Sequence, residues 1–322
     1  VGEVYAELEG LLGEEYPDVD VPKLFEFRSW AGSDRDGNPF VTPEVTTDTL
    51  ERQRAVVLEK YRTALKRLSG FLSQDGRRVD AGAELERSLN ADASRLPTVA
   101  AEAGDRYPSE PYRQKLKLMR ERLRRIEDVR PGGYADKTEL LDDLATIDRS
   151  LRSTGAGVVA DEYVEPLTRQ VDTFGFTLAS LDLRDHQQNH TEAVHEALAE
   201  AGIDYRGLDE DGRVEVLTES ILQPEPVIDL EDPGDVSELA ERVLQRFGML
   251  GEWQSEFGVG AIDTYCISMT EEPSHVLEVL FLADQAGAVS LPDHCGIDVV
   301  SLLETESALN GARRIMGTLF EN

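Results

Sequence analysis

The chain has 322 residues, which is enough for one large domain or two ordinary ones, and 40% of them are hydrophobic. Its 64 acidic and 33 basic residues give a formal net charge of −31, which argues against nucleic acid or an anionic membrane as a partner because both would repel it. The apolar residues recur with regular spacing, so we expect the charge to coat a folded core rather than to mark a disordered chain.

Cysteine and lysine usage point to the environment of the protein. Cys266 and Cys295 are too few for a disulfide framework, and we expect both to be small buried hydrophobic side chains. No run of 18 apolar residues and no charged-then-apolar leader is present, which predicts a soluble, cytoplasmic protein without membrane contact. Lysine occurs six times and all other basic residues are arginine. An acidic, lysine-poor surface resembles that of halophilic proteins and predicts a loss of stability at low salt.

The first half of the chain is predicted to be mostly helical. Apolar spacing places helices over residues 1–14, 46–72, 136–152 and 159–173, another from Ser109 to just before Pro131, and weak helix over 80–106. Pro111 suits a first helical turn, and Asp136 is a candidate helix cap. The chain starts with Val-Gly and ends in a helical pattern, so we expect it to be a piece of a longer protein.

The stretch Phe25–Thr42, FEFRSWAGSDRDGNPFVT, stands out within this half. The alternating aromatic pattern Phe25–Phe27 predicts a strand, a polar cluster follows over Gly32–Pro39, and a helix comes next. This order is typical of the strand-to-helix loops that carry chemistry in parallel α/β folds. The alternative is a plain turn, since Asp-Gly-Asn-Pro forms turns readily. A calcium loop is excluded because its required glycine and glutamate would fall on Pro39 and Val45.

The second half alternates predicted strands with helices. Strands are expected at Phe174–Arg184, Val259–Met269 and Ile297–Leu303, with helices at 189–202, 274–286 and 307–320 and two more near 214–222 and 235–247. All four strands of the chain end in charged residues, which predicts parallel strands joined by crossover helices. The predicted fold is therefore α/β with predominant α-helix: about four strands of a (β/α)8 TIM barrel embedded in many helices, in a single partial domain over 1–322.

Several motifs together resemble phosphoenolpyruvate carboxylase. They are SWAGSDRDGNP (Ser29–Pro39), EPYR (Glu110–Arg113), FGFTLASLDLRDHQQNH (Phe174–His190), TYCISMTEEPSHVLEVLFLADQAG (Thr264–Gly287) and SLLETESALNGA (Ser301–Ala312). Their order and spacing agree with the family over essentially the whole chain. The resemblance implies a TIM barrel surrounded by helices, a homotetramer, and strands two to five of that barrel in this chain.

The resemblance also implies a reaction and the residues that serve it. The family joins bicarbonate to phosphoenolpyruvate with Mg²⁺ or Mn²⁺, by way of carboxyphosphate and the pyruvate enolate, and releases oxaloacetate and phosphate. Arg184 matches the arginine that meets the substrate phosphate, where a guanidinium fork binds oxygens in pairs. Glu304 matches a glutamate of the metal pair, and a hard carboxylate suits Mg²⁺. Trp30 and Leu302 match the apolar wall beside the bicarbonate pocket, which keeps water from the enolate.

The remaining loop residues, Asp34, Arg35, Asp36 and Asn38, match the family as supporting scaffold around the reactants. The family has two glycines where this chain has Gly32-Ser33, and the serine is expected to alter a tight loop slightly. The family's catalytic histidine, second metal aspartate, active-site lysine, glycine-rich arginine loop and inhibitor site have no match here. The resemblance thus implies that the chain alone is inactive or nearly so.

The same residues have plainer interpretations when they are taken without the family. Arg184 and Asp185 can form a surface pair, Glu304 can sit in the first turn of the last helix, and Trp30 can be a core residue. The histidines His186, His190 and His195 are expected to lie on a helix surface or in the core, with no zinc site because the chain has no HExxH pattern. The acidic pairs Asp142-Asp143 and Glu271-Glu272 are expected to be solvated charges.

Two other functional classes remain open. One is a different metal-assisted barrel enzyme, and the other is a non-catalytic or degenerate halophilic relative of the carboxylase that serves as an α-rich scaffold.

Overall fold

The structure is a computed structural model that describes residues 2–15 and 21–322. Contacts divide the chain into two compact units. Unit 1 comprises Val1–Phe27 and Arg52–Leu178, and unit 2 comprises Arg28–Glu51 and Ala179–Asn322. Among the described residues, no helix combines the length and apolar character needed to cross a lipid bilayer.

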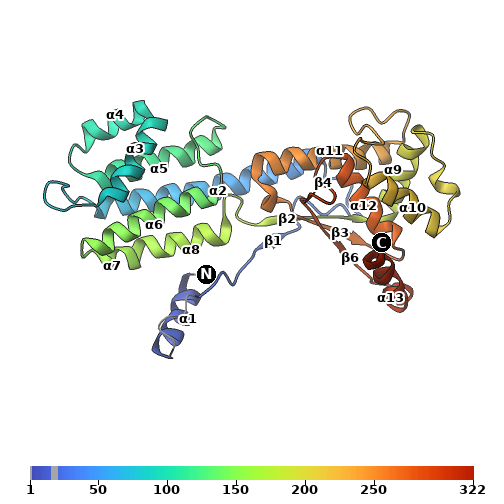
Figure 1. Ribbon diagram of the computed structural model, residues 1–322, viewed down its shortest axis with the longest axis horizontal. Coiled ribbons are helices and arrows are strands. Elements are labelled where there is room, and N and C mark those ends of the chain that lie inside the picture. The colour runs from blue at the N-terminus through green and yellow to red at the C-terminus, as the bar shows by residue number, and fades with distance from the viewer. Residues whose placement is uncertain (1, 16–20) are drawn as a thin grey trace. The chain divides into compact units, whose positions relative to one another are not determined.

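Unit 1 is helical in its described part (Figure 1). Its elements are α1 (Gly2–Glu15), the later part of α2 (Pro43–Phe71), α3 (Ala83–Arg95), α4 (Pro97–Arg106), α5 (Pro111–Glu127), α6 (Lys137–Ser153), α7 (Gly157–Val159), a π-helical turn (Ala160–Val164) and α8 (Glu165–Phe174). Apolar side chains of α2, α5, α6 and α8 form its core. The predicted helices are confirmed, and the predicted cap is confirmed too: the Asp136 carboxylate accepts hydrogen bonds from the Thr138 and Glu139 amides.

Unit 2 is built on a parallel sheet in the order β1-β2-β3-β6 (Figure 1). Its strands are β1 (Arg28–Ser29), β2 (Ser180–His186), β3 (Thr264–Ser268) and β6 (Asp298–Ser301), with a small hairpin of β4 (Val289–Ser290) and β5 (His294–Cys295). Its helices are the start of α2, α9 (Gln187–Glu200), α10 (Glu210–Ile221), α11 (Glu238–Phe257), α12 (Ser274–Gln285) and α13 (Glu306–Glu321), with 3₁₀ turns at Tyr205–Gly207 and Val259–Ala261. The helix-rich α/β class and the four parallel strands are as predicted.

Alternation along the strands separates the two faces of the sheet. Leu181 and Leu183 of β2, with Tyr265 and Ile267 of β3, pack into the core that α9, α11 and α12 cover. Residues at the intervening positions, including Arg184, therefore belong to the opposite face. A strand that reads apolar on one side and polar on the other can hold reactive side chains without disturbing the core.

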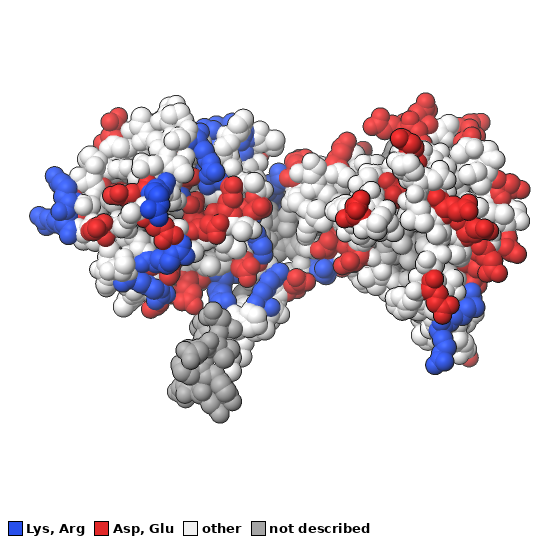
Figure 2. Space-filling view, in the orientation of Figure 1, with Lys and Arg blue, Asp and Glu red and all other residues white. Residues whose placement is uncertain are grey.

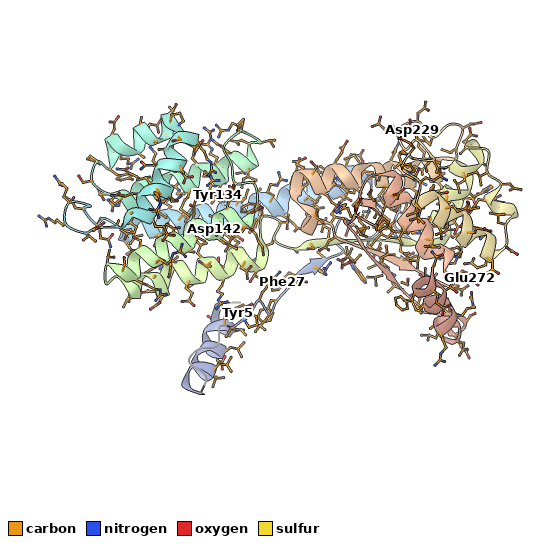
Figure 3. The ribbon with its side chains drawn as sticks, viewed as in Figure 1. Tyr5, Phe27, Tyr134, Asp142, Asp229 and Glu272 are labelled. Atoms are coloured by element: carbon orange, nitrogen blue, oxygen red, sulfur yellow. The ribbon has the colours of Figure 1, made fainter. Side chains whose placement is uncertain are left out.

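The predicted strand starts were partly wrong. Phe25–Phe27 is not a strand. Phe25 stacks on Phe27 and Phe27 on Phe174, with Tyr5 edge-on to Phe25, so these aromatic residues form a row of rings in unit 1. Figure 3 labels Tyr5 and Phe27. The strand expected from Phe174 begins only at Ser180, because the backbone turns at Gly175 (φ 54°) and Leu178 (φ 68°).

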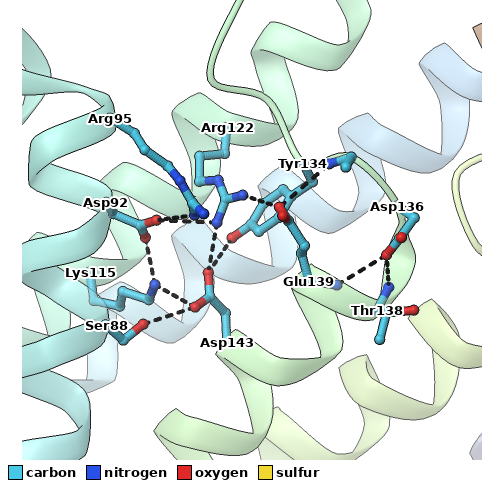
Figure 4. Close-up of polar contacts among 11 residues, drawn as sticks. Ser88, Asp92, Arg95, Lys115, Arg122, Tyr134, Asp136, Thr138, Glu139 and Asp143 are labelled. Carbon is cyan, nitrogen blue, oxygen red and sulfur yellow. Dashed lines mark hydrogen bonds and ion pairs between the residues drawn. The ribbon is translucent and has the colours of Figure 1, made fainter.

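Two expectations about burial were also wrong. Cys266 is buried as predicted, but Cys295 is exposed because it lies in the β4–β5 hairpin, which the sequence pattern did not reveal. Asp142 is exposed, but Asp143 is buried and accepts hydrogen bonds from Ser88 and Tyr134 inside unit 1 (Figure 4). Asp142 is therefore solvated as predicted, whereas Asp143 belongs to the interior of the helical bundle.

Candidate active site

The loop that follows β1 continues the sheet. The Arg35 amide donates to the Arg184 carbonyl at 2.8 Å, and the Arg184 amide donates to the Ser33 carbonyl at 3.3 Å, so residue 34 pairs with residue 184 as in a parallel ladder. Gly32 lies in the left-handed region (φ 84°), and a Cβ there would come within 2.2 Å of the Thr49 Oγ1 atom. Ser33 does not need a positive φ and is fully buried, so the serine fits the loop.

Arg184 is held by this loop. Its Nη2 atom lies 3.0 Å from Asp36 Oδ2 and its Nη1 atom 3.4 Å from Asp34 Oδ2. The guanidinium carbon lies 5.0 Å from the centre of the Trp30 ring. Trp30 is 48% exposed, so it is not a core residue. The Arg184 Nε atom is buried and has no hydrogen-bond partner among the described residues.

Asp185 does not pair with Arg184, because consecutive residues of a strand face opposite sides. It is buried and forms an ion pair with Arg246 of α11, and its other oxygen accepts from the His186 amide and from Asn189. Burial alone would raise the pKa of Asp185, but the Arg246 guanidinium holds it below its usual value. The carboxylate therefore stays ionised and ties β2 to α11.

Tyr265 and His190 complete the polar contacts behind β2. The Tyr265 hydroxyl accepts from Arg246 Nη1 at 3.1 Å and lies 2.8 Å from His190 Nε2. Burial lowers the pKa of His190 to about 4, so its imidazole is neutral at pH 7. His190 is thus a core residue, one of the two positions expected for it. Among the described residues, no group of three or more His, Cys, Asp or Glu side chains could hold a metal ion.

Arg35 points away from Arg184. Its guanidinium is buried and donates to the Ser33 carbonyl at 3.0 Å and to Thr46 Oγ1 at 2.6 Å. Burial, with the Arg246 guanidinium nearby, lowers the pKa of Arg35 to about 9. Asn38 is exposed and its side-chain oxygen accepts from the Phe40 amide at 3.2 Å, which fixes the next turn.

Leu302 and Glu304 follow β6 at the same edge of the sheet. The Leu302 amide donates to the Ile267 carbonyl at 2.9 Å, which extends the ladder with β3. Glu304 is exposed and accepts a hydrogen bond from the Met269 amide through Oε1 at 2.9 Å. Helix α13 begins only after Glu304, with Thr305 as its cap, so Glu304 does not belong to the helix's first turn.

The structure therefore brings some of the predicted site residues into contact and sets others apart. Trp30, Asp34, Asp36 and Arg184 form one cluster at the ends of β1 and β2. Glu304 follows β6, two strands from β2, a separation of about 10 Å at 4.8 Å per strand spacing. Leu302 lies beside Glu304, and no described contact joins this pair to the arginine cluster. All of them lie at or just after the carboxyl ends of parallel strands, where ligands bind in such sheets.

Glu304 suits a divalent metal ion as a single ligand. Mg²⁺ usually takes one or two carboxylates and completes its shell with water and substrate phosphate. The Oε1 atom of Glu304 bonds to Met269, whereas Oε2 has no hydrogen-bond partner among the described residues. The donor chemistry therefore fits Mg²⁺ or Mn²⁺.

Sequence reasoning missed three supporting features of the site. The Asp185–Arg246 pair joins residues that are 61 positions apart in the sequence, so no local sequence pattern could predict it. The burial of Ser33 was not predicted, because a serine in a polar loop is usually expected to be exposed. Met269 has a left-handed backbone (φ 59°) that turns its amide toward Glu304, and only the polar residues after β3 hinted at a turn there.

Comparisons with known proteins agree on one family. A family model described as phosphoenolpyruvate carboxylase matches residues 1–322. The chain is 36% identical over 324 residues to a phosphoenolpyruvate carboxylase of Roseiflexus castenholzii, which covers 95% of this chain and 34% of the relative. It is 34% identical over 346 residues to the one of Thermosynechococcus vestitus, covering 99% and 34%. The chain thus spans about a third of the length of the curated relatives it matches.

Proposed function

This chain belongs to the phosphoenolpyruvate carboxylase family, and we propose that it carries part of the catalytic centre of an enzyme that makes oxaloacetate and phosphate from phosphoenolpyruvate and bicarbonate. Oxaloacetate formed in this way would replenish the tricarboxylic acid cycle. The observation that carries the proposal is the position of Arg184 at the carboxyl end of a parallel strand, fixed by two aspartates, with a buried Nε donor left over.

The proposed chemistry has two stages. A bicarbonate oxygen bonds to the phosphorus of phosphoenolpyruvate while the bond from phosphorus to the enol oxygen breaks, which yields carboxyphosphate and the pyruvate enolate. Carboxyphosphate then releases CO₂ and phosphate, and C3 of the enolate bonds to the CO₂ carbon. Every electron pair is accounted for within the two substrates.

Each site residue has a role that suits its surroundings. Arg184 binds phosphate oxygens and the developing carboxyphosphate, and Asp34 and Asp36 position its guanidinium. Trp30 and Leu302 exclude water from the enolate. Glu304 supplies one metal ligand. A bound Mg²⁺ or Mn²⁺ would neutralise phosphate and enolate charge. Arg35 and Asn38 shape the loop from its other side.

We extend the proposal to the architecture. The four parallel strands, with α9, α11 and α12 packed on one face, form an arc of a (β/α)8 barrel, and the chain as a whole is one partial domain of it. The enzyme assembles as a homotetramer in the cytoplasm. Molar-mass measurement of the full-length protein in molar KCl tests the assembly, and a monomer would contradict it.

The experiment measures phosphoenolpyruvate-dependent oxaloacetate formation from bicarbonate, with Mn²⁺ in molar KCl, by the full-length enzyme. We expect Arg184→Ala to abolish activity and Arg184→Lys to reduce it by about 10²–10³-fold, because a lysine keeps the charge but not the fork. Arg313→Ala, an exposed arginine on α13, is the matched control.

The outcomes separate the candidates. If Arg184→Ala keeps activity within a few-fold of the unsubstituted enzyme, the role of Arg184 is wrong. If the unsubstituted enzyme forms no oxaloacetate, the chain belongs instead to a non-catalytic relative. Running the 322-residue chain alone in the same assay tests the expectation that it is inactive by itself.

A further inference from the structure

Unit 2 contains a cavity of about 380 Å³ that the proposed reaction does not use. It lies between the loop after β1, the start of α2, the start of α9 and α11, and its lining includes Arg35, Asn38, Asp185, Arg242 and Arg246. Neither Arg184 nor the other proposed substrate-binding residues line it. The loop after β1 thus has two sides. On one side its aspartates contact Arg184, and on the other side Arg35 lines this cavity.

The lining is positive in a very acidic unit. Unit 2 contains 35 acidic and 9 basic residues, yet three of those nine, Arg35, Arg242 and Arg246, line the cavity against two carboxylates, Glu44 and Asp185. Both oxygens of Asp185 are already engaged by donors of α9 and α11. Glu44 is exposed. With three arginines and two carboxylates, the lining keeps an excess of one positive charge.

Two of the arginines are buried with donors to spare. Arg35 and Arg246 are each 6% exposed, and the Nε atom of each is buried without a hydrogen-bond partner among the described residues. A buried donor without an acceptor is costly, so such groups usually have a partner in the working protein. Burial, together with repulsion from the Arg246 guanidinium, lowers the pKa of Arg35 to about 9.

The start of α2 adds to this preference. Thr42, Pro43 and Glu44 line the cavity, so the N-terminus of a 29-residue helix faces it. The dipole of a helix favours negative charge near its N-terminus. The charge of the cavity, its buried guanidiniums and the helix end thus all favour a negatively charged ligand.

We propose that this cavity binds a small oxyanion, of the phosphate or carboxylate class, between Arg35 and Arg246. A guanidinium fork matches both classes in shape and charge, and the volume suits a small molecule. A bound anion ties the loop after β1 to α11 and so steadies the aspartates that hold Arg184. The binding itself does not depend on the proposed function.

The test is isothermal titration calorimetry of the full chain with potassium phosphate and, in a separate experiment, with potassium acetate. Both titrations are done without divalent metal and at a constant ionic strength set with KCl. We expect saturable binding of one equivalent of at least one anion at this site, and the arm that binds names the class. Arg242→Gln should weaken it at least fivefold, and Arg35→Gln should weaken it more. Arg242 is half exposed, and its one ion pair within the described part of the chain is with Glu238 at 3.7 Å, so its removal should leave the fold intact.

Two controls make the result specific. Arg313→Gln removes the same charge from exposed α13 and should leave the affinity unchanged. Arg184→Gln removes the arginine of the proposed substrate site and should spare this binding, which separates a failure here from a failure of the proposed function. No saturable binding of either anion, or binding that Arg184→Gln abolishes and Arg242→Gln leaves unchanged, would overturn the proposal.

Discussion

Glu304 and Arg184, the proposed metal ligand and the proposed phosphate-binding residue, are held in place in different ways. Arg184 is fixed by carboxylates 148 and 150 positions earlier in the chain, whereas Glu304 is fixed by one backbone amide of the next strand's turn. The arginine is thus rigid and the glutamate keeps an oxygen for a ligand. Under the proposed function, Glu304 contributes metal affinity and Arg184 contributes the orientation of the phosphate.

The Glu304→Gln variant tests whether Glu304 is a metal ligand. Loss of the ionised carboxylate should raise the Mn²⁺ concentration for half-maximal activity of the full-length enzyme by about 100-fold, since hard cations prefer charged oxygens. Glu306→Gln removes the same charge two residues later, in the first turn of α13, and should change it less than about threefold. Equal Mn²⁺ dependence in the two variants would rule out Glu304 as a ligand.

Glu278 on α12 gives unit 2 a pH-dependent stability. It accepts hydrogen bonds from Thr191 at 2.7 Å and Tyr205 at 2.8 Å, and burial raises its pKa to about 7 despite these bonds. The folded state therefore holds a proton that the unfolded state releases above pH 4.5. This contribution is complete below pH 4.5 and is lost as the pH rises through 7, at most about 3 kcal/mol in total.

Glu278→Gln should remove that dependence because glutamine stays neutral. Between pH 5 and pH 8, the variant's free energy of unfolding should gain up to about 3 kcal/mol relative to the unsubstituted protein. His190 and His275, whose pKa values burial lowers to about 4, give the opposite trend, with stability present above pH 6.5 and lost toward pH 4, but equally in both proteins. Urea unfolding followed by tryptophan fluorescence measures the free energy of unfolding at each pH, with Glu252→Gln at an exposed position as control. If the difference between Glu278→Gln and the unsubstituted protein stays constant from pH 5 to pH 8, the prediction is wrong.

Elements differ in how far the sequence determines them. Helices such as α5 and α12 follow from apolar spacing, so their positions were predicted within a few residues. The start of β2 depended on turns at Gly175 and Leu178. Gly175 ends α8 as a glycine cap, but a leucine with a positive φ angle has no signal in the sequence. At the site, motif residues were found, but Arg246 was not, because its partner Asp185 lies on another element and looked like a surface charge.

The helices of unit 1 enclose a charged cluster that their apolar stripes did not predict (Figure 4). Lys115 of α5 is fully buried and pairs with Asp92 of α3 and Asp143 of α6, and Arg122 lies 3.1 Å from Asp92. Tyr134 donates to Asp143 at 2.7 Å. Opposite charges balance here, so the cluster fixes how three helices align.

Lys115→Met should therefore destabilise unit 1 by about 3–5 kcal/mol, because two carboxylates stay buried with one cation between them. Urea unfolding followed by circular dichroism measures the change, with Lys66→Met on the exposed face of α2 as control. Adding Asp92→Asn to the variant should restore part of the loss. A cost below about 1 kcal/mol would mean that the cluster is not essential.

Charge is distributed very unevenly over the whole molecule. Unit 2 has 35 acidic and 9 basic residues, a formal charge of −26, whereas unit 1 has 29 and 24, a charge of −5. All six lysines belong to unit 1. On the face drawn in Figure 2, acidic side chains predominate over the helices of unit 2 and mix with basic ones over unit 1. The acidic, lysine-poor composition from which we predicted a halophilic protein is thus concentrated in unit 2.

Low salt should consequently unfold unit 2 before unit 1. Repulsion among like charges reaches about 10 Å at 0.1 M salt but only about 3 Å at 1 M, so removing salt destabilises the strongly charged unit 2 more than unit 1. Trp30 and Trp253 are the chain's two tryptophans and both lie in unit 2, whereas far-ultraviolet circular dichroism reports the helices of both units. As KCl is dialysed away, tryptophan fluorescence should change at a higher salt concentration than most of the circular dichroism signal. Sucrose should not replace KCl, since it does not screen charge. Coincident transitions, or a helical signal that falls first, would show that charge asymmetry does not control the salt dependence of this protein.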